Sequence, residues 1–200
     1  MEIVPSPLQS YIKIYDEVME KNVLNTFLKI CKENPNFNDA EIASFEKNKP
    51  FFNYIDKKIR DVKKWDLHNI NEKNITNVFW ANYLCFKFNK CLKEYYNNIE
   101  SSFLGCSILN IQVLKYEKNG MYNFHVDHGP AVPRTISLIY FLNDDYEGGE
   151  LCFKFPGNPQ ELIVEKKANR IIVWPSNFLY PHAVKPVTKG TRYSVVSWAL

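Results

Sequence analysis

The stretch TISLIYFLNDDYEGGELCFKF, residues 135–155, contains two short runs that are rich in β-branched and aromatic side chains. The runs cover residues 135–142 and 151–155, and Asn, Asp and Gly residues separate them. Runs of this kind are typical of strands, and the residues between them are typical of turns. Similar runs cover residues 108–116, 170–174 and 192–198. Many short strands at this spacing predict a sandwich or barrel over residues 106–200.

The first half of the sequence has a different, helical periodicity. Apolar side chains recur at helical spacing over residues 11–33, and the pair Asn34-Pro35 ends the pattern. A second helix is predicted over residues 51–65, where Phe52, Ile55, Ile59 and Val62 are three or four positions apart. Its many Lys and Arg residues favour a solvated helix surface over the alternative, a face for nucleic acid or an acidic partner. A longer helix is predicted over residues 76–103.

The length and charge of the chain fit an ordinary globular protein. The 200 residues are predicted to form one α+β domain, in which a mainly helical part, residues 1–105, supports the β-rich part, residues 106–200. A net charge of +3 gives no strong signal for nucleic acid, and no apolar stretch is long enough to span a membrane. The five cysteines are scattered and form no C-x-x-C pair, which favours a reducing, cytoplasmic location.

Three side chains form a candidate metal site. His125 and Asp127 are two positions apart, so on a strand they point to the same face. His182 is the third candidate, from a later run that a β-sandwich can bring alongside. Two histidines and one carboxylate leave coordination positions open, as iron(II) oxygenases require. Zinc accepts the same ligands, but a closed structural zinc site usually has a fourth protein ligand.

A candidate carboxylate-binding pair follows ten positions after His182. Arg192 can bind a carboxylate through two parallel hydrogen bonds, which lysine cannot do. Ser194 lies two positions further on, so it shares a strand face with Arg192 and can add a hydroxyl donor.

The sequence over residues 108–200 resembles the prolyl 4-hydroxylase-like family of 2-oxoglutarate and iron(II) dioxygenases. The motifs that carry the resemblance are Tyr116-x-x-x-Gly120, Tyr122-x-x-His125-x-Asp127, Arg134-Thr135, Tyr140-Phe-Leu-Asn143, Gly148-Gly-Glu-Leu151, Trp174-Pro-Ser176, Pro181-His182 and Pro186-Val187-x-x-Gly190-x-Arg192-x-Ser194. This resemblance implies a double-stranded β-helix, a variant of the jelly roll, with supporting N-terminal helices.

The resemblance also implies roles for individual residues. His125, Asp127 and His182 are expected to bind iron, and Arg192 is expected to bind the C5 carboxylate of 2-oxoglutarate. The expected walls of the cosubstrate pocket are Tyr116 and Leu151. Several relatives have a tyrosine at the position of Phe141, whose ring cannot donate a hydrogen bond. Helpers of Arg192 are therefore expected among Ser194, Tyr140 and Thr135.

The implied cofactors are iron(II), 2-oxoglutarate and dioxygen, with ascorbate as a candidate reductant. The implied reaction is hydroxylation, with prolyl residues of a peptide or protein as the default substrate. Three alternatives stay open: a hydroxylase of a free amino acid or other small molecule, an inactive jelly-roll module for metal binding or interaction, and a nucleic-acid dealkylase. The dealkylase is disfavoured because the chain has no second basic residue after Arg192.

Overall fold

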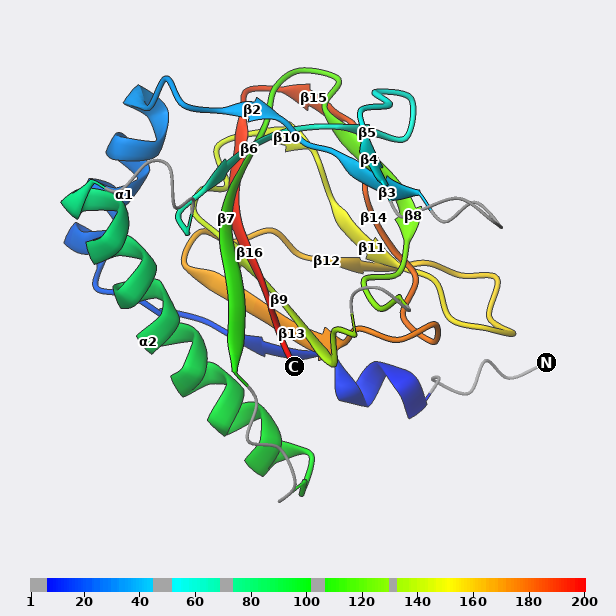
Figure 1. The fold of residues 1–200 in the computed structure, drawn as a ribbon. Helices are drawn as coiled ribbons and strands as arrows, with labels where there is room; N and C mark the ends of the chain where they lie inside the picture. Colours follow the sequence, from blue (N-terminus) through cyan, green and yellow to red (C-terminus); the bar gives the residue numbers. More distant parts are fainter. Residues whose placement is uncertain (1–6, 45–51, 69–73, 102–106, 130–132) are drawn as a thin grey trace.

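The chain contains two α-helices and a short 3-10 helix in the parts that a computed structural model describes, which are residues 7–44, 52–68, 74–101, 107–129 and 133–200 (Figure 1). The helices are η1 (Pro7–Tyr11), α1 (Lys21–Glu33) and α2 (Ile75–Asn98). Helix α1 begins later than predicted, and it ends where Asn34 becomes extended before Pro35. Helix α2 confirms the predicted long helix. The helix ends at Asn98, earlier than the predicted end at Phe103, which itself lies outside the described residues.

Two antiparallel sheets form the β part of the structure. In spatial order, the seven-stranded sheet contains β1 (Lys13–Tyr15), β13 (Arg170–Pro175), β9 (Ile136–Phe141), β16 (Arg192–Ala199), β7 (Ile108–Tyr116), β6 (Lys63–Asp66) and β2 (Asn38–Asp39). The five-stranded sheet contains β12 (Leu162–Val164), β11 (Leu151–Phe153), β14 (His182–Val184), β8 (Met121–His125) and β5 (Arg60–Asp61). Two small two-stranded sheets pair β3 (Ile42–Ser44) with β4 (Phe52–Tyr54), and β10 (Glu147–Gly148) with β15 (Val187–Lys189).

The order of strands identifies a jelly roll. From β7 onward the chain alternates between the two large sheets, because β7, β9, β13 and β16 belong to one and β8, β11, β12 and β14 to the other. This crossing pattern is that of a double-stranded β-helix, so the predicted fold class is confirmed. The crossing places the ends of β8, β14 and β16, which are far apart in sequence, near one another.

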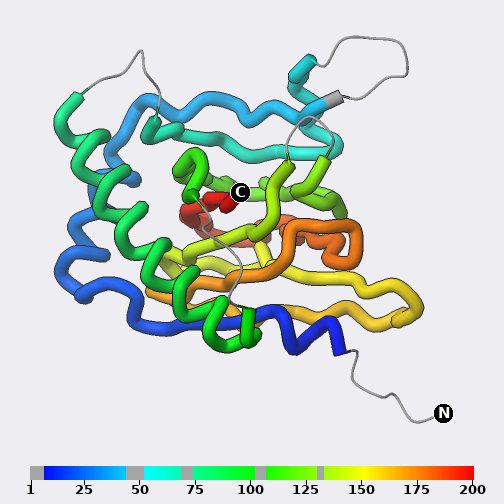
Figure 2. The backbone as a smooth tube through the Cα atoms, turned by 60° about the horizontal axis from the view of Figure 1, so that its bottom comes forward, coloured from blue at the N-terminus to red at the C-terminus, as the bar shows by residue number. Residues whose placement is uncertain are grey.

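Two hydrophobic cores hold these layers together. One lies between the helices and the outer face of the seven-stranded sheet, where Phe88 of α2 packs edge-on against Tyr140 of β9 at a centroid distance of 6.3 Å. The other lies between the two sheets and includes Tyr116, Phe141 and Leu151. Figures 1 and 2 show both helices on the same side of the seven-stranded sheet. The helices therefore support the sheet from outside and leave the space between the sheets for a site.

The predicted helix over residues 51–65 is wrong. Its described part, residues 52–65, contributes to the strands β4, β5 and β6, and Phe51 lies outside the described residues. Val62 and Trp65 are both buried, but they belong to different cores on opposite sides of the sheet. Apolar residues three positions apart share one face of a helix, whereas in a strand they face opposite ways. Both faces are covered here, so the spacing resembles that of a helix.

The N-terminal half is therefore less helical than predicted. Strands β1, β2 and β6 extend the seven-stranded sheet, and β5 extends the five-stranded sheet. Since residues of both halves pair in the same sheets, we propose that they fold as one domain. No helix in the described parts of the chain is long and apolar enough to cross a membrane.

Candidate metal centre

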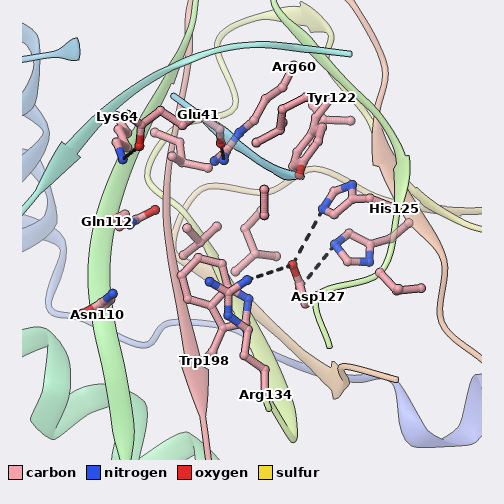
Figure 3. Close-up of a pocket in the computed structure, with 18 of the residues that line it drawn as sticks. Glu41, Arg60, Lys64, Asn110, Gln112, Tyr122, His125, Asp127, Arg134 and Trp198 are labelled. Atoms are coloured by element: carbon pink, nitrogen blue, oxygen red, sulfur yellow. Dashed lines mark hydrogen bonds and ion pairs between the residues drawn. The ribbon is translucent and has the colours of Figure 1, made fainter. Parts of the chain in front are cut away.

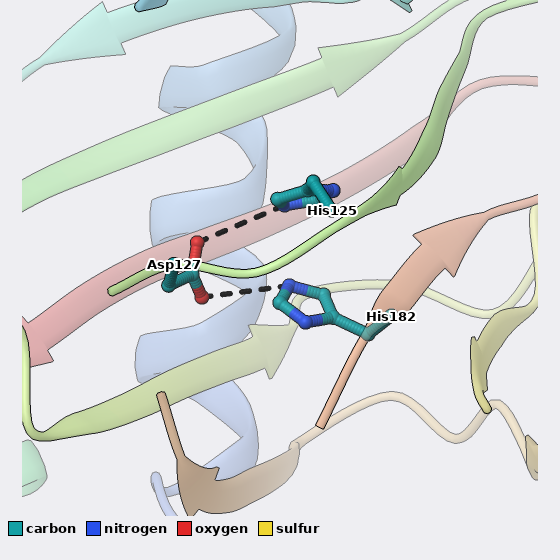
Figure 4. A group of neighbouring side chains, drawn as sticks. All are labelled: His125, Asp127 and His182. Atoms are coloured by element: carbon teal, nitrogen blue, oxygen red, sulfur yellow. Dashed lines mark ion pairs between the residues drawn. The ribbon is translucent and has the colours of Figure 1, made fainter. Parts of the chain in front are cut away.

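Three side chains from adjacent strands of the five-stranded sheet meet at one point (Figure 4). Strand β8 ends at His125, Asp127 follows it, and His182 at the start of β14 is the cross-strand partner of His125. One ligand atom from each residue lies within 4.8 Å of the other two. Nε2 of His125 is 3.7 Å from Oδ1 of Asp127, and Nε2 of His182 is 3.4 Å from Oδ2. The structure thus brings together the three predicted metal ligands.

Backbone carbonyl groups orient both imidazole rings. Nδ1 of His125 lies 2.9 Å from the carbonyl oxygen of Asn123, and Nδ1 of His182 lies 3.1 Å from that of Tyr180. A carbonyl oxygen only accepts hydrogen bonds, so each Nδ1 carries the proton. Each Nε2 then has a free lone pair that points toward Asp127. Histidines that bind metals are commonly oriented by such a hydrogen bond through the other ring nitrogen.

The charge state of the three groups suits a metal cation. Burial lowers the pKa of His125, and the neighbouring His182 lowers it further, so the imidazole of His125 is neutral. Burial alone raises the pKa of Asp127, but the two histidines and a hydrogen bond from Ser137 outweigh it and hold the pKa below its ordinary value. The Ser137 hydroxyl donates to Oδ2 of Asp127 over 2.6 Å and also contacts the hydroxyl of Ser176.

This donor set fits iron(II). Two neutral imidazoles and one carboxylate form the ligand set of mononuclear iron(II) oxygenases, in which further coordination positions serve cosubstrate and dioxygen. Among the described residues, the cluster contains no fourth histidine, cysteine or carboxylate. A closed structural zinc site is therefore a poorer match.

Arg192 is buried without a carboxylate partner. It begins β16 and is 0% exposed, and within the described residues its three guanidinium nitrogens make no ion pair and no hydrogen bond of regular geometry. Its Cζ lies 4.7 Å from the ring centroid of Tyr116 and 5.2 Å from that of Phe141. The Ser194 hydroxyl is also buried and unpaired among the residues described. A buried, unpaired charge is costly, so Arg192 fits a site for a carboxylate.

The predicted pocket residues separate into two groups. Tyr116 and Leu151 line the same cavity as the three candidate ligands, and Tyr116 also reaches Arg192. Tyr140 does not join them, because its ring lies in the core under the helices and its hydroxyl donates to Asn169 over 2.7 Å. Thr135 precedes β9, where its backbone pairs with Ala199.

The candidate ligands line a cavity of about 590 Å³ that opens to the surface (Figure 3). Tyr54 and Val126 line it and are each 38% exposed. Near the metal position, the Tyr122 ring stacks on His125 at a centroid distance of 3.6 Å. Two arginines, Arg60 and Arg134, also line the cavity.

The two arginines stand beside aromatic rings of the cavity. The guanidinium of Arg134 lies 3.6 Å from the Trp198 ring, and one of its nitrogens is 3.8 Å from Oδ1 of Asp127. Arg60 lies 4.7 Å from the Tyr122 ring. In the sequence, Arg60 is only one of the basic residues of the helix predicted over residues 51–65. Its position on β5 depends on long-range pairing that local sequence does not reveal.

The other histidines and Cys152 do not join the ligand cluster, although His128 lines the same cavity. His128 follows Asp127 closely, but its Nδ1 contacts the carbonyl oxygen of Arg134 over 2.8 Å. His68 accepts a hydrogen bond from the backbone of Ile111, which indicates a structural role. Cys152 is buried in β11 and points away from the ligands toward the carbonyl oxygen of Ala183.

Known proteins share both the sequence and the fold of this site. Residues 111–200 match the family model described as the 2OG-Fe(II) oxygenase superfamily. This part of the chain is therefore similar in sequence to that superfamily. The description of the superfamily names iron(II) and 2-oxoglutarate, and the donor set of the candidate metal centre is compatible with iron(II).

The curated relatives are PKHD-type hydroxylases. One from Xylella fastidiosa (strain M23) is 39% identical over 98 residues, which cover 42% of this chain and 41% of the relative. Another, from Gloeothece citriformis (strain PCC 7424), is 38% identical over 90 residues, which cover 42% of this chain and 39% of the relative. The match thus spans about two-fifths of the length of these relatives.

Solved structures of prolyl hydroxylases have the same fold. One, from Trichoplax adhaerens and in complex with a peptide fragment of the hypoxia inducible factor oxygen degradation domain, has a TM-score of 0.72 at 18% identity over 96% of this chain and 84% of that one. A prolyl-4-hydroxylase from Pseudomonas putida has a TM-score of 0.66 at 18% identity over 94% and 91% of the two chains. The similarity extends beyond the family match to the N-terminal half.

Proposed function

We propose that this chain is an iron(II)- and 2-oxoglutarate-dependent dioxygenase that hydroxylates prolyl residues of a peptide or protein. The observation that supports it most is the cluster of His125, Asp127 and His182. Both Nε2 atoms in this cluster are free and face the same carboxylate. The match of residues 111–200 to the oxygenase superfamily supports the same proposal.

Each candidate residue has a role in this proposal. His125, Asp127 and His182 bind iron, and Ser137 holds the Asp127 carboxylate in position. With 2-oxoglutarate and dioxygen, the bound iron supplies the oxidising chemistry. Arg192 binds the distal carboxylate of the oxoacid, which satisfies its unpaired guanidinium.

The walls of the cavity orient the oxoacid and limit access of water. Leu151 is buried and apolar, and Tyr116 bridges the space between the metal ligands and Arg192. Ser194 contributes a second donor to the distal carboxylate. Exclusion of water strengthens the electrostatic interactions of the bound oxoacid.

A peptide or protein substrate is supported by similarity and by the open cavity. The curated relatives are named hydroxylases, and solved structures of this fold include prolyl hydroxylases, one of them with a bound peptide fragment. The rim at Tyr54 and Val126 is exposed, so a chain longer than one residue can reach the metal.

A free amino acid is a second candidate substrate. Arg134 stands beside Asp127, and its Nε is buried without a hydrogen-bond partner among the residues described. A guanidinium in this position can bind the carboxylate of a small substrate near the metal. Comparison of free proline with proline-containing peptides distinguishes the two substrate classes.

Succinate formation tests the proposed activity. The purified chain is incubated with iron(II), 2-oxoglutarate and ascorbate, alongside His182→Ala and Arg192→Ala. We expect succinate from the wild type and a large loss in both variants. Equal behaviour of the three proteins refutes the proposal and favours an inactive binding module. Mass spectrometry of candidate peptides for the gain of one oxygen then identifies the substrate.

We also propose a cytoplasmic location. Cys31, Cys85, Cys91 and Cys152 are free thiols, and Cys106 lies outside the described residues. Burial raises the pKa of Cys91 to about 11, which keeps this thiol protonated and unreactive. Free thiols are typical of a reducing compartment. Localisation of the tagged chain in its host cell tests this.

A further inference from the structure

A buried hydroxyl group that sequence motifs did not identify lies beside Arg192. We infer that the Tyr146 hydroxyl donates a hydrogen bond to the distal carboxylate of the oxoacid, and so replaces the donor that Phe141 lacks. The inference rests on the proposed function and adds a specificity-determining residue to it. Tyr146 lies in the loop between β9 and β10, five positions after Phe141.

Tyr146 and Arg192 converge on the same small volume. Both side chains contact Gly149, where an added Cβ atom would lie 3.2 Å from Cε2 of Tyr146 and 3.2 Å from Cδ of Arg192. Gly149 has a φ of +66° and leaves room for both. A larger residue at this position would force the two side chains apart.

The polar groups beside Arg192 are buried and poorly satisfied. In the described part of the chain, the Tyr146 hydroxyl, the Ser194 hydroxyl and the guanidinium of Arg192 make no hydrogen bond of regular geometry, although the Tyr146 hydroxyl lies close enough to Arg192 to interact with it. Tyr146 itself is only 3% exposed. Each buried polar group without a partner destabilises a protein, so three such groups together indicate a ligand that satisfies them. The two hydroxyls and the guanidinium can donate hydrogen bonds, so the expected ligand has hydrogen-bond acceptor atoms.

A carboxylate matches these donors in number and charge. Its two oxygens accept about four hydrogen bonds. The fork of Arg192 supplies two donors, and the hydroxyls of Ser194 and Tyr146 supply one each. Burial raises the pKa of Tyr146, although the charge of Arg192 and a hydrogen-bond interaction with its guanidinium oppose the rise. The phenol therefore keeps its proton, and because a guanidinium only donates, the hydroxyl hydrogen stays available for a ligand. The Phe141 ring is within 5.2 Å of Arg192 but provides no donor.

The loop that carries Tyr146 is fixed relative to Arg192. The Asn143 side chain donates to the carbonyl oxygen of Thr191 over 2.8 Å and accepts from the backbone of Tyr193 over 2.7 Å, so it bonds to both neighbours of Arg192. Lys166 donates to the carbonyl oxygen of Tyr146 and lies 4.7 Å from its ring centroid. The hydroxyl is thus held in position before any ligand binds.

The substitution Tyr146→Phe tests the inference through binding. Anaerobic calorimetry with manganese(II) in place of iron measures the affinity for 2-oxoglutarate and for 2-oxopentanoate, which has the same chain length but no distal carboxylate. We expect Tyr146→Phe to weaken 2-oxoglutarate binding about tenfold or more, because hydrogen bonds to charged groups are strong. Affinity for 2-oxopentanoate should stay within about twofold. This oxoacid ends in a methyl group, so Tyr146→Phe removes no hydrogen bond to it and only a small apolar contact.

Two further variants control for folding. Tyr140→Phe removes a buried hydroxyl that has a partner and faces the helices, so it should lower the melting temperature and leave 2-oxoglutarate affinity unchanged. Tyr146→Phe removes a buried hydroxyl that makes no hydrogen bond of regular geometry with a described residue, so the melting temperature without ligand should fall less than in Tyr140→Phe. In the Tyr146→Phe background, Phe141→Tyr should restore binding by placing a hydroxyl near Arg192 again.

The outcomes separate this inference from the proposed function. If the wild type does not bind 2-oxoglutarate, both are refuted. If the wild type binds and Tyr146→Phe binds equally well, only the role of Tyr146 is refuted. Equal weakening of both oxoacids by Tyr146→Phe, without rescue by Phe141→Tyr, also refutes it, since it indicates general damage to the pocket.

Discussion

Arg192 should make the ligand-free protein less stable than it would be with an apolar side chain at this position. Its guanidinium is fully buried, and none of the described residues pairs with it. The neighbouring rings of Tyr116 and Phe141 compensate in part, at about 0.5–2 kcal/mol for each cation–π contact. Desolvation of an unpaired charge costs several kcal/mol, so these contacts offset only part of it.

The substitution Arg192→Met preserves most of the side-chain length and removes the charge. Replacement of buried charges by apolar residues of similar volume often stabilises proteins by about 1–4 kcal/mol. We therefore expect the free energy of unfolding without ligand to rise by an amount in this range. For a chain of this size the melting temperature should rise by about 2–4 °C for each kcal/mol.

Addition of 2-oxoglutarate should reverse the order of stability. With manganese(II) present, oxoacid at about 100 times its dissociation constant stabilises the wild type by about 2.7 kcal/mol. Arg192→Met should show almost none of this shift, because the distal carboxylate has lost its charged partner. Thermal denaturation of both proteins, with and without oxoacid, measures the four values.

Arg170→Met is the matched control. Arg170 is also buried, but it pairs with Asp16 at 2.7 Å and with Glu165 at 3.2 Å. Its loss should lower the melting temperature and leave the shift with oxoacid intact. The reasoning is refuted if Arg192→Met melts well below the wild type without ligand, or if it keeps the full shift with 2-oxoglutarate.

Three smaller predictions concern the surroundings of the site. Ser137→Ala removes the hydrogen bond to Asp127 and should weaken metal binding about 10–100-fold in a titration, and an unchanged affinity would show that the bond is dispensable. Gly149→Ala should destabilise the protein by more than the roughly 1 kcal/mol expected for Gly157→Ala. Both glycines have positive φ, but only an added Cβ at 149 would meet neighbouring atoms, so equal losses of stability on urea denaturation would contradict this. The pKa of Asp16 is lowered to about 2 by its hydrogen bond to an arginine, so its contribution to stability is present above about pH 4 and is lost as the pH falls toward 2. Asp16→Asn should flatten this decline in stability, and a pH profile identical to that of the wild type would exclude the effect.

The metal site could be predicted from the sequence because its geometry is mostly local. His125 and Asp127 share a strand end, and the order of the motifs placed His182 in the same sheet. Helix α2 could also be predicted, since its buried side chains follow one helical stripe. The strands at residues 52–66 could not be predicted in this way. Their extended conformation depends on hydrogen bonds between β5 and β8 and between β6 and β7, which are far apart in sequence.

The sequence also could not predict which face of the sheet the Tyr140 side chain occupies. All six residues of β9 are buried, so alternation between polar and apolar residues does not reveal which face points to the site. In the structure Tyr140 faces the helices and Phe141 faces Arg192. Tyr146 was missed because it lies among turn residues, whose side-chain directions depend on tertiary contacts.

A crystal structure with metal and oxoacid bound tests the central claim most directly. Crystals grown anaerobically with manganese(II) and 2-oxoglutarate would locate the metal by its anomalous scattering. We predict one peak about 2.0–2.3 Å from Nε2 of His125, Nε2 of His182 and a carboxylate oxygen of Asp127, with the distal carboxylate of the oxoacid on Arg192. A metal bound elsewhere, or an oxoacid that does not reach Arg192, would contradict the account.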